Sequence, residues 1–143
     1  MKTNQEIFTQ VADHLMEQDQ RAWDATTSAY AYRTADGLRS AVGCLIPDEL
    51  YHEDLEGITI CDIIRPGSGA ELLTSTLLAS GIPATVEVRD LLIDLTFIHD
   101  HREPIMWPDD LSKLARSYGL TVPESVKRRV SWPPLKAQVG QNV

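Results

Sequence analysis

Residues 85–99 read TVEVRDLLIDLTFIH, and apolar side chains recur in this stretch at intervals of three and four residues. Such spacing is typical of a helix with one buried face. The apolar face comprises Val88, Leu91, Leu92, Leu95 and Ile98. Because Pro83 opens the element, the pattern predicts a central helix from Ala84 to about His99.

The N-terminal segment carries the clearest helix signal outside this stretch. Thr3 followed by Glu6 is a capping box, which fixes the start of a helix. The pattern extends to about Gln20, and its apolar stripe comprises Ile7, Phe8, Val11, Ala12, Leu15 and Met16.

Two more helices are expected. Ser68 and Glu71 form a second capping box before a leucine-rich stretch, and Gly81 is a natural residue to end that helix. The last helix begins near Pro108 and ends at Gly119. The apolar stripe of the leucine-rich helix comprises Leu72, Leu73, Leu77 and Leu78.

Two alternating segments predict a small β-hairpin. Residues 29–33 and 38–42 alternate in polarity, and residues 34–37 supply a loop that ends in Asp-Gly. Residues 58–64 are rich in β-branched side chains and fit either a strand or a helical turn. The expected fold class is therefore α+β, mostly α, with four main helices and one small two-stranded antiparallel hairpin.

Residues 1–122 are expected to form a single globular domain with one core. We expect residues 123–143 to be a tail, partly ordered at best, and residues from about Pro133 onward to be dispensable for folding. The predicted core comprises Phe8, Val11, Leu15, Val42, Leu45, Leu73, Leu77, Leu91, Leu92, Leu95, Leu111 and Leu114.

The charge of the chain is uneven. The net charge is −8, but residues 1–110 hold 7 lysines and arginines against 20 carboxylates, whereas residues 111–143 hold 6 against 1. An acidic body repels phosphate backbones, so we expect no direct nucleic-acid binding. A basic protein partner is the alternative to a purely solubilising role, and the homo-oligomeric state stays open.

No targeting signal is visible in the sequence. The first residues, MKTNQEIF, contain one lysine and no apolar region, so we expect no signal peptide. The apolar runs are much shorter than the roughly 20 residues that a membrane span needs. We therefore expect a cytoplasmic protein that does not bind a membrane.

The best candidate for metal chemistry is His99-Asp100-His101. Imidazole and carboxylate groups are common metal ligands. However, side chains at i and i+2 point to different sides of a helix, and a cation at a helix C-terminus explains His99 equally well. We expect no cofactor and no tightly bound metal.

Other catalytic patterns are weak. Cys44 with His52 would supply a thiol and a base, but Cys44 lies in an apolar run that raises a thiol pKa. Cys44 and Cys61 are both expected to be reduced and buried. Gly67-Ser68-Gly69 resembles half of a dinucleotide fingerprint but lacks its third glycine.

A run of carboxylates around one tyrosine is the best candidate for a binding surface. We call it the acidic run, and it comprises Asp48, Glu49, Tyr51, Glu53, Asp54 and Glu56. Exposed carboxylates of this density steer association with a basic partner.

Three segments together resemble a family of small uncharacterised bacterial and phage proteins. They are EIFTQVADHLMEQ (residues 6–18), YAYRTADGLRSAVGCLIPDELYHEDLEG (residues 30–57) and IDLTFIHDHREPIMWPDDLSKLARSYGL (residues 93–120). The resemblance covers most of residues 4–120, and residues 32–57 are its most specific part. It implies a small intracellular domain often encoded by phages or prophages, and it assigns no catalytic residue.

The sequence thus favours a non-catalytic intracellular protein-binding module. Its sharpest form is a phage- or prophage-encoded inhibitor that binds a basic, nucleic-acid-handling machine through the acidic run, in the host cytoplasm. The alternative is a small metal-dependent hydrolase built on His99, Asp100 and His101. Whether any catalysis exists stays open at this stage.

Overall fold

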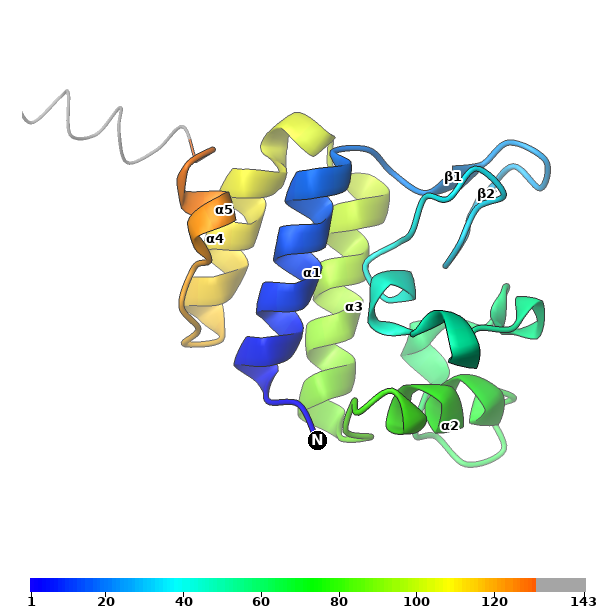
Figure 1. The fold of residues 1–143 in the computed structure, drawn as a ribbon. Coiled ribbons are helices and arrows are strands. Elements are labelled where there is room, and N and C mark those ends of the chain that lie inside the picture. The colour runs from blue at the N-terminus through cyan, green and yellow to red at the C-terminus, as the bar shows by residue number, and fades with distance from the viewer. Residues whose placement is uncertain (131–143) are drawn as a thin grey trace, which may run out of the picture.

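The computed structural model describes residues 1–130 and confirms a mostly helical α+β fold. Helices α1, α3 and α4 pack side by side, and α5 packs on α1 and α4 (Figure 1). The helices are α1 (Asn4–Gln18), α2 (Glu71–Ala79), α3 (Val86–His101), α4 (Trp107–Ser117) and α5 (Glu124–Lys127).

The strands, the turns that follow them and α2 lie mainly on the side of α3 that faces away from α4 (Figure 1). The described chain contains two short strands, β1 (Trp23–Asp24) and β2 (Ala29–Tyr30). Four 3-10 turns follow them, and a fifth precedes α4. They are η1 (Gly43–Leu45), η2 (Asp48–Leu50), η3 (Glu53–Leu55), η4 (Ile60–Asp62) and η5 (Pro104–Met106).

The N-terminal helix begins as the sequence predicts. The hydroxyl of Thr3 accepts from the amide of Glu6 at 3.1 Å, and the Glu6 carboxylate accepts from the amide of Thr3 at 2.9 Å. These bonds hold the pKa of Glu6 below its usual range. The helix ends two residues before the predicted Gln20, because Asp19 adopts a left-handed conformation at φ 53°.

The prediction of a second capping box at Ser68 and Glu71 is wrong. The residue before α2 is Ala70, which makes no side-chain cap, and the Ser68 hydroxyl donates to the carbonyl of Asp62 at 2.8 Å. The leucine stripe is also half right: Leu73 and Leu77 are buried, whereas Leu72 and Leu78 are exposed.

The helix ends at α2 and α4 follow the glycine signals in the sequence. Gly81, at φ 86°, directly follows Ser80, the C-cap residue of α2. Its amide donates to the carbonyl of Leu78 at 3.0 Å. Gly119, at φ 67°, has the same place after α4. The left-handed conformation stops a helix, and glycine adopts it without steric cost.

The central helix exists but is shifted by two residues. The hydroxyl of Thr85 accepts from the amide of Val88 at 3.2 Å, so α3 starts at Val86 and continues to His101. Of the twelve predicted core residues, eleven are buried, and Leu114 is partly buried against them.

The hairpin is displaced from its predicted position. The strand pairing joins Trp23 to Tyr30 and Asp24 to Ala29, whereas residues 33 and 39 form only an isolated bridge. The second predicted strand, residues 38–42, leads into η1. In residues 58–64, the chain forms the 3-10 turn η4 and buries Ile60 and Ile63.

Packed structure continues beyond residue 122. Val126 on α5 is fully buried, and the Arg129 guanidinium bonds the carbonyl of Met16 at 2.8 Å and the carboxylate of Asp19 at 2.9 Å. Residues 123–130 therefore pack against α1 rather than forming a loose tail. The expectation that residues from Pro133 onward are dispensable concerns residues outside those described.

No helix among the described residues is long and apolar enough to cross a membrane. This result agrees with the absence of long apolar runs in the sequence.

Gly43, at the start of η1, lies close against the backbone of Tyr32. A Cβ atom added at Gly43 would meet the carbonyl oxygen of Tyr32 at 1.9 Å. That carbonyl accepts from the amide of Ser40 at 3.1 Å, so it has little freedom to move. Only glycine fits at this position, where η1 contacts the backbone that follows β2.

We therefore expect Gly43→Ala to lower the free energy of unfolding by about 3 kcal/mol, as overpacking against fixed backbone does. The matched control is Gly37→Ala, where the added Cβ meets no atom within 4 Å and only the left-handed φ of 89° opposes it. That variant should lose about 1 kcal/mol. Urea unfolding measures both, and equal losses would contradict the close contact.

Candidate functional site

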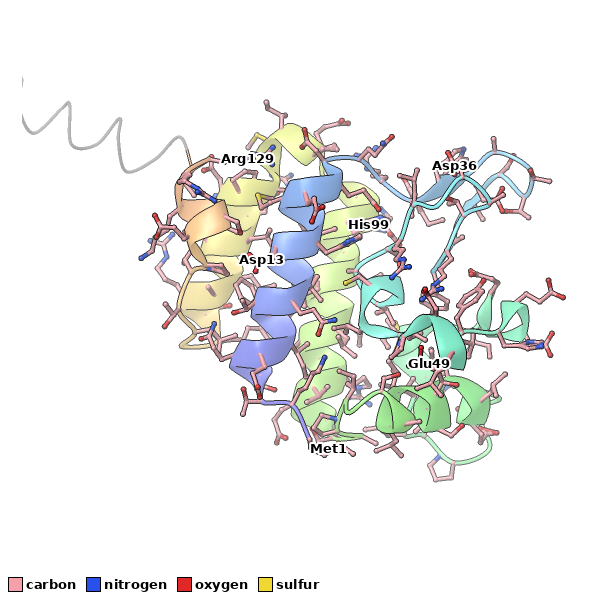
Figure 2. All side chains as sticks on the ribbon, in the orientation of Figure 1. Met1, Asp13, Asp36, Glu49, His99 and Arg129 are labelled. Carbon is pink, nitrogen blue, oxygen red and sulfur yellow. The ribbon has the colours of Figure 1, made fainter. Side chains whose placement is uncertain are left out.

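The acidic run occupies the two consecutive turns η2 and η3, on the side of α3 away from α4 (Figure 2, with Glu49 labelled). The structure divides its members into two groups. Glu49, Glu53 and Asp54 are exposed, and no described lysine or arginine forms an ion pair with them. The other members bind neighbouring parts of the protein.

Asp48 is the anchor of the first turn. Its Oδ1 atom lies 2.8 Å from a guanidinium nitrogen of Arg33 and 2.9 Å from one of Arg39. Arg33 also donates to the carbonyl of Ile46 at 2.6 Å and lies 4.7 Å above the ring of Tyr51. These contacts fix η2 on the segment that follows β2.

Glu56 is a structural carboxylate. Its two oxygens accept from the amide of Tyr32 at 2.9 Å and from the amide of Arg33 at 3.1 Å. It also accepts from the hydroxyl of Tyr51 at 2.6 Å, and burial together with this bond raises the pKa of Tyr51. A carboxylate with three such donors stabilises the loop itself rather than a ligand.

His99 has a role that the sequence did not reveal. It is fully buried, and its Nε2 atom accepts from the amide of Ala22 at 2.9 Å. Its Nδ1 atom therefore carries the proton and donates to Asp100 at 2.5 Å. The ring lies 5.7 Å from that of Tyr30 and 5.9 Å from that of Trp107, so it joins α3 to the hairpin and to α4.

The geometry does not favour the metal alternative. Both nitrogens of His99 are engaged, and His101 is exposed, with its ring 5.0 Å from that of Phe97. Among residues 1–130, no group of three or more histidine, cysteine, aspartate or glutamate side chains is placed to hold a metal. His99, Asp100 and His101 thus do not converge on one point.

The two cysteines differ. Burial raises the pKa of Cys44 to about 12, and its sulfur lies 3.1 Å from the carbonyl of Ala41. Cys61 is exposed, so the prediction that both thiols are buried is wrong for Cys61. His52 does not activate Cys44, because its Nδ1 atom accepts from the amide of Asp54 at 3.0 Å.

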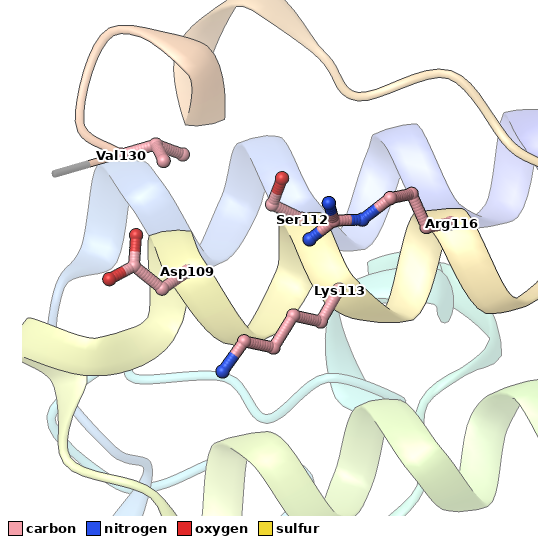
Figure 3. Close-up of a pocket in the computed structure, with 5 residues that line it drawn as sticks. All are labelled: Asp109, Ser112, Lys113, Arg116 and Val130. Carbon is pink, nitrogen blue, oxygen red and sulfur yellow. The ribbon is translucent and has the colours of Figure 1, made fainter. Parts of the chain in front are cut away.

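Two hollows of about 430 Å³ flank α4. One is lined mainly by polar side chains of α4 and by Val130 (Figure 3). The other lies between α3 and α4 and combines Phe97 and Leu114 with charged residues. Both mix charges of opposite sign, and neither gathers groups for a particular reaction.

Comparisons of the chain with models of protein families, with curated proteins and with solved structures give no match. The proposal below therefore depends on the chemistry of the described residues. The resemblance to small bacterial and phage proteins stays a prediction.

His99 and His101 form a matched pair for testing the role of the imidazoles. We expect His99→Ala to lower the free energy of unfolding by about 3 kcal/mol, because it leaves a cavity and an unpaired amide at Ala22. His101→Ala should change it by less than about 0.5 kcal/mol. Denaturant unfolding with and without added zinc measures both, and a zinc-dependent stability lost in both variants would restore the metal alternative.

The thiols should react at very different rates. In native protein at pH 8, a chromogenic disulfide reagent should modify Cys61 rapidly and leave Cys44 protected, because a pKa of about 12 keeps the Cys44 thiolate scarce. Denaturant should release the second equivalent. The Cys61→Ser variant is the control, and rapid native labelling of that variant would contradict the buried state of Cys44.

Proposed function

We propose that the protein is a non-catalytic protein-binding module that uses its acidic run to bind a basic protein partner. The observation that supports this proposal best is the exposure of Glu49, Glu53 and Asp54 on two fixed turns. None of the three has a lysine or arginine partner among the described residues. Charges of this kind raise the rate of association with an oppositely charged surface.

The fixed turns support this proposal because they limit the entropy lost on binding. Asp48 forms ion pairs with two arginines, and Glu56 accepts hydrogen bonds from the amides of Tyr32 and Arg33, just after β2. The three exposed carboxylates therefore project from a backbone that other contacts already position. A surface arranged before binding loses less conformational freedom when the partner docks.

The charge of the partner follows from the same surface. Nucleic acid is disfavoured by like-charge repulsion, whereas the basic groove of a nucleic-acid-handling protein is complementary. In its sharpest form, the proposal is a nucleic-acid-mimicking inhibitor encoded by a phage or prophage and acting in the host cytoplasm. The resemblance to phage proteins motivates that form.

The roles of Asp48 and Glu56 determine how the surface should be tested. Reversing either charge would break contacts within the protein, so a loss of binding would be ambiguous. Glu49 and Glu53 are exposed and make no such contact among the described residues. The control is Glu17→Lys/Glu87→Lys, which changes the net charge equally on the exposed surface of α1 and α3.

We expect Glu49→Lys/Glu53→Lys to lose at least about tenfold in capture of a specific partner from a lysate of the native host, because two favourable contacts become repulsive. Quantitative mass spectrometry measures the capture, and raised salt should weaken it for wild type. The Glu17→Lys/Glu87→Lys control should retain the partner. Equal capture by all three proteins, or capture that salt does not affect, would contradict the proposal.

A further inference from the structure

A small pocket of about 200 Å³ lies beside the acidic run, between four separate segments. Tyr30 and Tyr32 line one side, and residues 56–60 line another. Thr96 and Asp100, one turn apart on α3, line a third side, and Ser40 completes the lining. The pocket therefore brings together two aromatic rings, the carboxylates of Glu56 and Asp100, and the hydroxyl of Thr96.

The pocket carries negative charge without a matching cation. Asp100, whose side chain is 21% exposed, accepts a hydrogen bond from the neutral ring of His99, and Glu56 accepts hydrogen bonds from neutral donors only. Among residues 1–130, no lysine or arginine forms an ion pair with either carboxylate. Burial and these two carboxylates together raise the pKa of Tyr32.

Thr96 provides a second, independent observation at this pocket. Its Oγ1 atom is buried and has no hydrogen-bond partner among the described residues. Buried hydroxyls are nearly always paired, and a group bound in this pocket would supply a partner for this one.

We propose that this pocket binds a guanidinium group, supplied by an arginine side chain of the basic partner. The inference deepens the proposed function, on which its choice of partner rests. A guanidinium carries one positive charge and five donors, which match the Asp100 carboxylate and the Thr96 hydroxyl. Its flat face also packs on tyrosine rings, and a pocket of about 200 Å³ admits a side chain of this size.

Two other cations fit less well. A metal ion would need a third ligand, and no such group exists among the described residues. A lysine ammonium would satisfy the charge but is a compact, strongly hydrated group that gains less from two aromatic walls. The arrangement of acceptors and rings therefore favours arginine.

The test uses N-acetyl-arginine-N-methylamide as the probe, added to isotope-labelled protein and followed by amide NMR. The matched probes are the citrulline analogue, which has the same shape without the charge, and the lysine analogue. We expect saturable shifts at residues 30–32, 56–60 and 96–100 with the arginine probe, and at least about tenfold weaker binding of the other two.

Three variants localise the binding. Thr96→Val and Asp100→Asn should each weaken the arginine probe about tenfold, whereas Glu49→Gln, with the same charge change as Asp100→Asn, should not. Thr96→Val removes an unpaired buried hydroxyl, so its thermal midpoint should equal or exceed that of wild type. Lost binding in a protein of undiminished stability cannot be attributed to unfolding.

Several outcomes would overturn the inference. No saturable shift with the arginine probe, equal binding of the citrulline or lysine analogue, or unchanged binding in Thr96→Val and Asp100→Asn would each do so. Capture of the native partner by Asp100→Asn then distinguishes the source of the guanidinium. Lost capture supports an arginine of the partner, and retained capture with lost probe binding overturns that source.

The two proposals fail separately. Glu49→Lys/Glu53→Lys alters the exposed carboxylates and leaves Thr96 and Asp100 unchanged, so its effect on capture tests the acidic run alone. The arginine probe tests the pocket without any partner present. Partner capture that depends on the acidic run but no probe binding would leave the binding module standing and remove the pocket.

Discussion

The segment between β2 and α2 depends on side chains that form hydrogen bonds with its backbone, and the carboxylate of Glu56 is the most important of them. Between β2 and α2 the described chain forms only short turns and one isolated bridge, so its buried amides lack the partners that a helix or sheet would provide. Glu56 pairs the amides of Tyr32 and Arg33, and Arg33 pairs the carbonyl of Ile46. Side chains of α1 complete the set, and they are Gln10, His14 and Gln18. Because His14 is partly buried at this junction, its pKa lies below the usual range and it bonds the Arg39 carbonyl as a neutral ring.

This division explains what the sequence could predict. Helices and their ends arise from contacts three or four residues apart, so the capping box at Thr3 and the C-terminal glycines were readable in a single chain. The hairpin was misplaced because the backbone of Arg39 bonds the side chain of Gln18 on α1, and residues 33 and 39 pair only at an isolated bridge. The Ser68–Glu71 box failed for a similar reason, since the Ser68 hydroxyl bonds the carbonyl of Asp62 instead.

The sequence predicted which residues form the candidate site, but it did not predict which of them bind the protein's own backbone and which are exposed. The sequence identified the carboxylates of residues 48–56 as one surface, yet nothing local separates Glu56, which binds two distant amides, from Glu53, which is exposed. His99 was equally ambiguous, because its partner, the amide of Ala22, lies far away in the chain. Thr96 drew no attention in the sequence, and Asp100 was considered only as a metal ligand, until folding placed both beside Tyr30 and Tyr32. Long-range partners decide such roles, and periodicity carries no information about them.

One consequence of the architecture connects stability with binding. Carboxylates crowded on two short turns repel one another. The protein offsets this repulsion at Asp48 with two arginines, whereas Glu49 and Glu53 have no ion-pair partner among residues 1–130. Neutralising every charge within the chain would have stabilised the turns further but would have left no field to attract a partner. The same separation recurs in the pocket, where Glu56 is saturated by internal donors and Asp100 accepts from a neutral histidine. In both places, one carboxylate holds the backbone and its neighbour has no lysine or arginine partner among residues 1–130.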